Sequence, residues 1–383
     1  MCLRRLLPSS RLIQTFSGHK KIFDLIRGKL IMKHVMGIIG YGGMGKHHHK
    51  HICEEIKDIT VKGAYDINKE KWDVIKERGL SVYESAEALM ADKEVDIILV
   101  STPNNWHKYY SIMALKAGKN VVCEKPVMMN SGELKEVMAV AKECGKVFTI
   151  HQNRRWDRDY LLVKRALENG SIGKPFYIES RVDGSRGIPG DWRCTKVAGG
   201  GMMLDWGVHL IDQMLMLYPQ NKVTEIYAQV LNLKYDEVDD NLKINMKFDN
   251  GVCALIEVGT YHFIPLPRWH ICGDKGTMCI QNWDSGADIV RAKSSEMNWE
   301  QGIVYTAAGP TRTMAPRPKE TIEQTHIPID DKKSVHLFYE NVIDAIDGKA
   351  ELIVKPSEAM RSMLFMEACF KSSNEGICVK ENI

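Results

Sequence analysis

Short apolar runs alternate with segments of helical pattern from residue 34 onward, and this alternation constrains the fold more than any other feature of the sequence. The run 34–40 has the continuous apolar character of a strand that is buried on both faces of a parallel sheet. Further strands are expected at 61–66, 95–103, 120–126 and 147–153, with intervening helices that end at Ile56 or span 68–79, 107–118 and 131–145. Strands that alternate with helices of this length predict βαβ units around a doubly wound parallel sheet.

The pattern changes after about Asn153, where antiparallel signals replace the alternation. The turns Asp249-Asn250-Gly251 and Asp274-Lys275-Gly276 each join two alternating runs, which indicates hairpins. Strands are expected at 176–184, 223–235, 241–248, 252–261, 268–273 and 277–283, and helices at 157–170, 205–217, 334–346 and 356–373. The sequence therefore predicts an α/β protein with a parallel domain, 32–154, and a second domain of α+β character, 155–383.

Composition agrees with a globular protein of two domains and excludes several other classes. At 383 residues, the chain is longer than one hydrophobic core usually serves. Hydrophobic residues make up 44% and charged residues 26%, and a net charge of +3 gives no reason to expect nucleic acid as a partner. The 10 cysteines form no CxxC pair, which favours reduced thiols in the cytoplasm over disulfides. No apolar run is long enough to predict a membrane span.

Residues 1–31 have a different composition from the rest of the chain. They are rich in Arg, Lys and Ser, and Asp24 is their only acidic residue. This composition fits a mitochondrial-type transit peptide. The alternative is that translation begins at Met32, immediately before the first strand. With either reading, we expect the extension to be dispensable or a targeting segment, outside the fold.

A glycine-rich turn follows the first expected strand and opens a helix. Its pattern is G-x-G-x-x-G, and an acidic residue, Asp66, ends the next strand. In this context the glycines allow a tight turn and close approach of the backbone, and the helix N-terminus meets a pyrophosphate, as in a Rossmann fold. Asp66 would accept hydrogen bonds from the ribose hydroxyls and repel a 2′-phosphate, so NAD is expected rather than NADP. The cofactor residues predicted here are Gly40, Tyr41, Gly42, Gly43, Met44, Gly45 and Asp66.

Polar residues follow two later strands at the same edge of the predicted sheet. The carboxyl ends of parallel strands are where α/β sheets bind ligands. At this edge Lys125 would point towards the nicotinamide, placed by Pro126 through a peptide bond that we expect to be cis. The residues expected at the cofactor are therefore Ser101, Thr102, Pro103, Asn104 and His107 after one strand, and Glu124 and Lys125 after the other.

A third motif follows three consecutive glycines. Asp205 and His209 are four residues apart, so on a helix they would share a face. A carboxylate beside an imidazole raises its basicity and orients its ring, which suits a general base near neutral pH. A structural ion pair is the alternative for such a pair.

The string His47-His48-His49-Lys50-His51 suggests a metal site at first sight. Consecutive helical residues point in different directions, so they cannot form one coordination shell. We therefore expect a solvated face at the start of the first helix, with His48 near the cofactor phosphates, and no metal.

The ordered set of these motifs resembles the Gfo/Idh/MocA family, the relatives of glucose–fructose oxidoreductase and inositol dehydrogenase. The resemblance extends from about Met32 to the C-terminus. Residues 151–173 are most similar to the scyllo-inositol dehydrogenase and sugar or glycoside oxidoreductase branch. The resemblance implies a second domain with a large, open, mostly antiparallel sheet, and homo-oligomers, dimers or tetramers, formed through that sheet.

The resemblance also assigns roles to individual residues. The catalytic Lys, Asp and His of the family fall on Lys125, Asp205 and His209. Trp192-Arg193 matches a pair that some members place near the cofactor or substrate, and Arg154 and Trp156 are further candidates for substrate contact.

The expected reaction transfers hydride between a secondary hydroxyl of a sugar or glycoside, such as C3 of a pyranose, and the nicotinamide of NAD. An inositol is the alternative substrate. A regulatory protein that senses NAD or a sugar is the alternative of another class, since fold alone does not establish catalysis.

Overall fold

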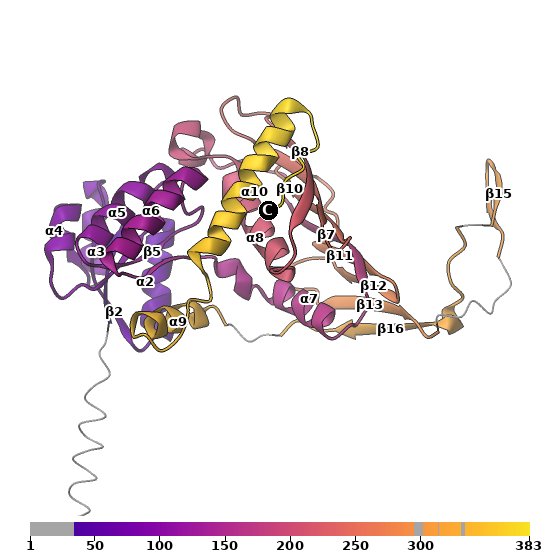
Figure 1. Cartoon of the computed structure of the whole chain (residues 1–383), viewed down its shortest axis with the longest axis horizontal. Coiled ribbons are helices and arrows are strands. Elements are labelled where there is room, and N and C mark those ends of the chain that lie inside the picture. Colours follow the sequence, from indigo (N-terminus) through magenta and orange to yellow (C-terminus); the bar gives the residue numbers. More distant parts are fainter. Residues whose placement is uncertain (1–33, 295–301, 313, 331–333) are drawn as a thin grey trace, which may run out of the picture.

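The computed structural model describes residues 34–294, 302–312, 314–330 and 334–383 and contains two main sheets flanked by helices (Figure 1). The first is a parallel sheet of six strands in the order β3-β2-β1-β4-β5-β6. The strand order reverses between β1 and β4, which creates the switch point at which doubly wound sheets bind ligands. Its strands are β1 (His34–Ile39), β2 (Ile59–Tyr65), β3 (Ser81–Val82), β4 (Ile97–Val100), β5 (Asn120–Cys123) and β6 (Phe148–Ile150).

Helices cover this sheet and connect its strands, as the alternating pattern predicts. The side chain of Asn130 accepts a hydrogen bond from the Glu133 amide at the start of α6, and Gly145 ends the helix in the left-handed conformation. α3 and α4 are too short for helical periodicity to show in the sequence, and α4 was not predicted. The helices are α2 (Gly43–Glu55), α3 (Trp72–Glu77), α4 (Ala86–Ala91), α5 (His107–Lys116) and α6 (Ser131–Cys144).

The second sheet has eight strands in the order β16-β13-β12-β11-β7-β10-β9-β8. Neighbouring strands are antiparallel except for β7 and β10, which confirms the mostly antiparallel sheet that the resemblance implies. The strands are β7 (Pro175–Asp183), β8 (Val223–Leu231), β9 (Asn241–Phe248), β10 (Cys253–Gly259), β11 (Trp269–Gly273), β12 (Gly276–Ile280), β13 (Ala287–Ala292) and β16 (Ile322–Ile327). β13 and β16 were not predicted, and β8 ends four residues before the expected Tyr235.

Helices α7 (Arg158–Glu168), α8 (Val208–Leu217) and α10 (Pro356–Glu375) pack against the second sheet. The indole nitrogen of the fully buried Trp269 donates a hydrogen bond to Asp159 on α7, 2.8 Å away, so sheet and helix share one core. α10 lies along β8, where the hydroxyl of Ser372 accepts a hydrogen bond from the Ala228 amide. A small hairpin of β14 (Val304–Thr306) and β15 (Gly309–Thr311) stands apart from both sheets (Figure 1).

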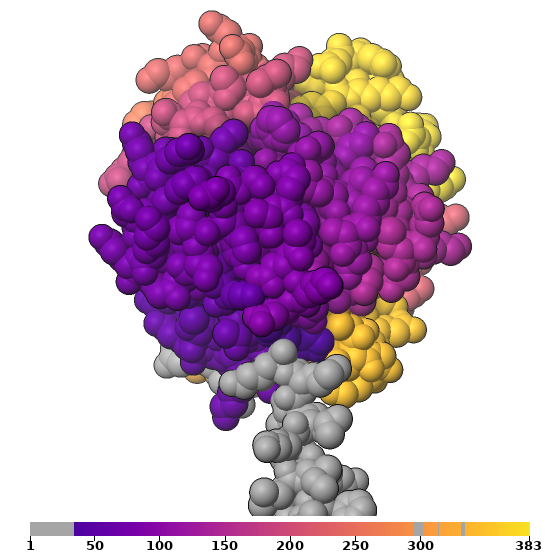
Figure 2. Space-filling view, turned by 90° about the vertical axis from the view of Figure 1, so that its left-hand side faces the viewer, coloured from indigo at the N-terminus to yellow at the C-terminus, as the bar shows by residue number. Residues whose placement is uncertain are grey.

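α9 (His336–Ile346) is late in the sequence but packs against the N-terminal domain. It contacts α2, and Asp347, just after α9, lies 3.2 Å from the imidazole of His34 at the start of β1. Figure 2 shows the gold segment around α9 directly against the indigo and magenta surface of this domain. The C-terminal part of the chain therefore completes the structure of the first domain before α10 returns to the second sheet.

Among the described residues, the structure contains no helix that is long and apolar enough to cross a membrane. The extension predicted at residues 1–31 lies outside the described residues.

A buried ionic cluster joins the segment after β6 to two helices of the second domain. The Nε and Nη2 atoms of Arg155 each donate a hydrogen bond to the Asp212 carboxylate on α8 at 2.7 Å. The Nη1 atom of Arg155 donates to Glu358 on α10 at 2.6 Å. Arg155 and Asp212 are 9% and 2% exposed. Removing one partner of such a pair leaves an uncompensated buried charge.

We predict that Arg155→Met lowers the free energy of unfolding by about 3–5 kcal/mol, measured by urea denaturation. Lys50→Met is the matched control, because Lys50 pairs with Glu54 at 3.8 Å while both side chains are more than half exposed. The control should change stability by no more than about 0.5 kcal/mol. Equal effects of the two substitutions would show that the Arg155 cluster does not hold the helices together.

Candidate active site

A cavity of about 610 Å³ lies at the carboxyl edge of the parallel sheet. It extends from Tyr65 and Asp66 after β2, past the glycine turn after β1, to Lys125 after β5 and Asp205 of the second domain. Eleven of the fourteen predicted cofactor residues line it, namely Gly40, Gly42, Gly43, Met44, Asp66, Ser101, Thr102, Pro103, Asn104, Glu124 and Lys125. Trp192 and Arg193, predicted at the substrate, line its other wall.

The glycine turn has the shape that a dinucleotide needs. Gly40 has φ +86°, and a Cβ there would lie 2.6 Å from the Ser101 carbonyl oxygen. A Cβ on Gly45 would lie 2.3 Å from the carbonyl oxygen of Gly40, so α2 approaches the turn too closely for any side chain. At Gly42 and Gly43, by contrast, a Cβ would meet no protein atom within 4 Å, so this backbone faces open space. The turn therefore fits a pyrophosphate at the N-terminus of α2.

Asp66 is held in place at the far end of the cavity by its neighbours. Its carboxylate accepts hydrogen bonds from the backbone amides of Tyr41, at 2.7 Å, and Asn68, at 2.9 Å. The ammonium of Lys71 lies 2.9 Å from the same carboxylate and also lines the cavity. The predicted ribose ligand is thus in position, and a cation that the sequence argument did not consider stands beside it.

Three predicted cofactor residues lie behind the cavity wall. Tyr41 is fully buried, and its hydroxyl bonds to His49 at 2.7 Å. Gly45 lies in the first turn of α2, and His107 is buried at the start of α5. The imidazole of His107 lies within 3.0 Å of the carbonyl oxygens of Thr102 and Pro126. It joins the loops after β4 and β5, and the Lys125–Pro126 peptide bond is cis, as expected.

Lys125 and Asp205 form the contact between the two domains at the near end of the cavity. The ammonium of Lys125 donates to the Asp205 carboxylate at 2.9 Å and to its backbone carbonyl at 2.8 Å. Arg193 lies 3.4 Å from the other carboxylate oxygen. Burial alone would raise the pKa of Asp205, but Lys125 and Arg193 hold it below its usual range. Asp205 is therefore an ionised acceptor between two cations.

His209 is buried, and its Nδ1 atom has no hydrogen-bond partner among the described residues. Its ring centroid lies 6.0 Å from that of Trp206. Burial, followed by the positive charges of Lys125 and Arg154, lowers the pKa of His209 well below its usual value. A neutral imidazole at this place can accept a proton.

The expectation that Asp205 raises the basicity of His209 was wrong. The two side chains were expected to share one face of an α-helix, but Met203–Gly207 form a π-helical turn before α8. Each hydrogen bond of a π-helical turn spans five residues instead of four, so side chains four positions apart no longer lie on one face. Such turns are frequent at functional sites. The carboxylate of Asp205 instead binds Lys125 and Arg193, so its orienting effect acts on the lysine.

Aromatic and cationic side chains gather beside His209. The guanidinium of Arg154 stacks on Trp206, 4.1 Å from its ring centroid, and lies 5.3 Å from that of Trp283. Trp156 packs against Phe338 instead, and it is absent from the cavity lining, as are Arg154 and His209. Sequence reasoning missed Trp206, although it lies inside the third motif. Trp283 follows β12 and carries no local signal, because only the fold brings it to this place.

The histidines of α2 were expected to form a solvated face, and this was wrong for most of them. His48, His49 and His51 are 1%, 8% and 8% exposed, and burial lowers their pKa values. His48 was expected near the cofactor phosphates, but it contacts Glu124 and Tyr339 behind the cavity. Tyr339 of α9 packs against His48 and His51, and His49 packs against Tyr41, so part of this burial comes from a segment far away in the sequence.

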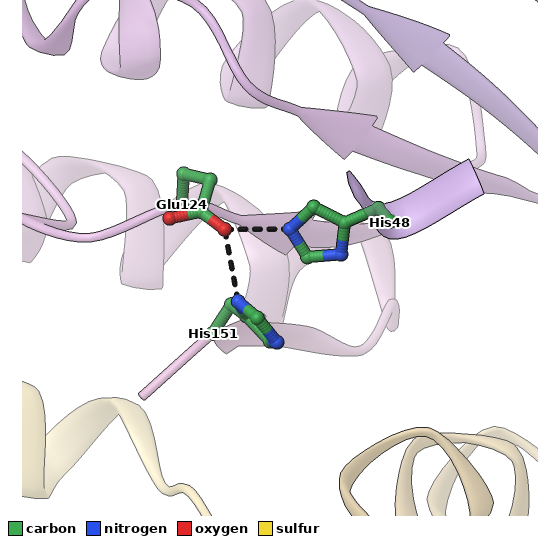
Figure 3. A group of neighbouring side chains, drawn as sticks. All are labelled: His48, Glu124 and His151. Carbon is green, nitrogen blue, oxygen red and sulfur yellow. Dashed lines mark hydrogen bonds and ion pairs between the residues drawn. The ribbon is translucent and has the colours of Figure 1, made fainter. Parts of the chain in front are cut away.

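His48, Glu124 and His151 form a compact cluster (Figure 3), and their facing atoms lie within 4.8 Å of one another. Both imidazoles contact the same carboxylate oxygen of Glu124, from 2.6 Å for His48 and 2.9 Å for His151. These are hydrogen-bond distances, so two N–H groups donate to one carboxylate. The three side chains therefore form a hydrogen-bonded cluster around one carboxylate oxygen.

Residues 35–152 match the model of the Gfo/Idh/MocA oxidoreductase family, NAD-binding Rossmann fold, and residues 160–279 match its C-terminal domain. The crystal structure of an NAD-binding protein from Listeria innocua is 42% identical, with a TM-score of 0.87 over 91% of this chain and 99% of that one.

Two of the curated relatives whose names state an activity are dehydrogenases of a cyclitol and of a glucoside. The scyllo-inositol 2-dehydrogenase (NADP(+)) of Bacillus subtilis is 24% identical over 95% of this chain and 98% of that protein. The D-glucoside 3-dehydrogenase of Escherichia coli is 28% identical over 63% of this chain and 75% of that protein. The matches support an oxidoreductase rather than the regulatory alternative.

We predict that Gly43→Ala leaves the fold intact but weakens NADH binding about tenfold, because the added methyl group enters space that only the ligand fills. Fluorescence titration with NADH measures the affinity, and thermal unfolding checks the fold. Gly302→Ala is the control, because a Cβ there makes only an ordinary 3.7 Å contact with Ala315. Unchanged NADH affinity in Gly43→Ala would place the cofactor elsewhere.

Proposed function

This chain belongs to the Gfo/Idh/MocA family of NAD-binding oxidoreductases, and on that basis we propose that it oxidises a secondary ring hydroxyl of a sugar or glycoside, such as C3 of a pyranose, or catalyses the reverse reaction. One observation carries the proposal. Lys125 and Asp205 line the cavity together, away from Asp66, where we expect the nicotinamide end of a bound dinucleotide, and the π-turn that contains Asp205 leads on to the buried His209.

The proposed chemistry divides among three side chains. His209, neutral in the folded chain, removes the hydroxyl proton as the general base. Lys125 donates a hydrogen bond to the oxygen as negative charge develops on it, and this stabilises the transition state more than the ground state. Asp205 fixes the ammonium of Lys125 and offers its carboxylate to a neighbouring substrate hydroxyl. The nicotinamide cofactor, when bound, accepts the hydride from the substrate carbon.

The surroundings of the site support a polyol ring as the substrate. Such a ring needs donors and acceptors around its rim and a flat apolar surface for its C–H face. Arg193 and Asp205 supply the first, and Trp192 on the cavity wall supplies the second. All-equatorial glucose and scyllo-inositol present nearly the same rim of hydroxyls, and the two named relatives act on a D-glucoside and on scyllo-inositol. A glucoside is therefore our first candidate, and an inositol is the second.

Deoxy analogues test this proposal and locate the reacting carbon. A site built to bind a hydroxyl strongly rejects an analogue that lacks it. With methyl glucoside as the parent substrate, NADH formation should be lost with the 3-deoxy analogue and retained with the 6-deoxy analogue. Equal rates with the parent and its 3-deoxy analogue would refute oxidation at C3. Faster turnover of scyllo-inositol than of every glucoside would favour the second candidate.

We expect NAD to bind more tightly than NADP, because the Asp66 carboxylate occupies the place that a 2′-phosphate would need. NADH should bind about tenfold more tightly than NADPH, and Asp66→Ala should remove the difference. Lys71 is the competing influence, since its ammonium lies 2.9 Å from Asp66 and could attract a phosphate. Tighter binding of NADPH by the unmodified chain would show that Lys71 decides the preference.

Lys125→Met and His209→Ala should each lower turnover roughly a hundredfold or more, while NADH affinity changes little in His209→Ala. The pH dependence separates their roles. Because the pKa of His209 is lowered from 6.5, the acidic limb of kcat/KM for alcohol oxidation should lie below pH 6.5. Loss of the Lys125 charge removes one cause of this lowering, so the limb should move to higher pH in Lys125→Met. An unmoved limb would show that another group titrates.

We propose that the chain works in the cytoplasm as a homo-oligomer formed through the open sheet. Along β8, Ile226 and Ala228 point into the core, while Tyr227 is 41% exposed on the other face. Tyr177 on β7 has the same orientation as Tyr227 in the register of the sheet and is partly exposed. Apolar groups on an uncovered sheet face mark an interaction surface. Light scattering should give the mass of a dimer or tetramer for the unmodified chain and a smaller mass for Tyr227→Asp. A monomer at micromolar concentration would contradict this.

A further inference from the structure

Four buried titratable groups, of which only Glu124 also lines the cavity, have no part in the proposed reaction. They are Tyr339 on α9, His48 on α2, Glu124 after β5 and His151 after β6 (Figure 3 shows the last three). Tyr339 is fully buried, and His48, Glu124 and His151 are at most 5% exposed. Burying so many polar groups is unfavourable unless all are satisfied, so their hydrogen bonds show what the cluster does.

The hydrogen bonds run in one direction. The Tyr339 hydroxyl donates to Nδ1 of His48, and Nε2 of His48 donates to Glu124 from 2.6 Å. This leaves His48 neutral, with each ring nitrogen in a defined role. The second oxygen of Glu124 accepts the backbone N–H of Lys125 at 3.2 Å. The chain of contacts thus ends at the backbone of the lysine whose ammonium holds Asp205.

We propose that Tyr339, His48 and Glu124 are positioning residues for Lys125, through which helix α9 fixes the catalytic edge of β5. Tyr339 and His48 are 291 positions apart, so the contact forms only when α9 is docked on α2. Without the Tyr339 hydroxyl, Nδ1 of His48 is left buried and without its donor. The His48 imidazole is then no longer held in its orientation towards Glu124. The Glu124 carboxylate, which accepts the Lys125 amide, therefore becomes less well fixed.

Tyr339→Phe tests this proposal because it removes one oxygen atom and little volume. Tyr218→Phe is the matched control, since the Tyr218 hydroxyl is also buried but has no hydrogen-bond partner in the described part of the chain. Hydrogen exchange followed by mass spectrometry should show about tenfold faster exchange of the Lys125 amide in Tyr339→Phe and no change there in Tyr218→Phe. His48→Gln should reproduce the effect, and it replaces Tyr339→Phe if that variant does not fold.

The exchange measurement needs no substrate, so it stands even if the proposed function fails. A second measurement rests on the proposed function. Tyr339→Phe should lower kcat about tenfold with NADH affinity unchanged, and it should have no further effect in a Lys125→Met background. The proposal is overturned if exchange at Lys125 is unchanged in both variants, or if the losses of Tyr339→Phe and Lys125→Met multiply. The second result would mean that Tyr339 affects turnover independently of Lys125.

Discussion

The ion pair between Lys125 and Asp205 is the interaction on which the arrangement of the site depends. Lys125 stands at the carboxyl edge of the parallel sheet, and Asp205 stands on the π-turn of the second domain. The pair therefore links the first domain to the second domain at one end of the cavity. A second link lies nearby, where the side chain of Asn104 donates to the Gly199 carbonyl oxygen at 2.7 Å. Both links join loops after parallel strands to the segment 191–207, which carries the polar wall of the cavity.

The buried charged groups of this site are stable because each has a partner that offsets the free-energy cost of desolvation. Asp205 lies between Lys125 and Arg193, and Glu124 accepts from two imidazoles and one amide. Burial by itself raises the pKa of Glu124, but His151 and His48 lower it well below its usual value. His209 differs from these groups, because its Nδ1 atom is one of several buried polar atoms that have no hydrogen-bond partner in the described chain. An unsatisfied buried group of this kind is rare in stable cores and common where a ligand completes the contact.

The local sequence was enough to predict those parts of the site that lie directly after a parallel strand. The glycine turn, Asp66 and the Lys125–Pro126 edge each follow a strong buried strand, and their roles depend on geometry that every parallel strand end shares. Three features could not be predicted in this way. The π-turn at Met203–Gly207 has no distinct periodicity, Trp283 reaches the site through sheet topology, and the burial of His48 depends on α9. Each of these depends on contacts between segments far apart in the chain.

Deuterium transfer tests the central claim most directly. Methyl glucoside carrying deuterium on C3 is incubated with NAD⁺ and the full chain, and the NADH formed is examined by mass spectrometry. If the nicotinamide end of the cavity lies beside Lys125 and His209, and C3 is the reacting carbon, the NADH should gain one deuterium. NADH that forms without the label, with deuterium retained on the sugar, would contradict oxidation at C3. No NADH from any glucoside or inositol would contradict the account of the site itself.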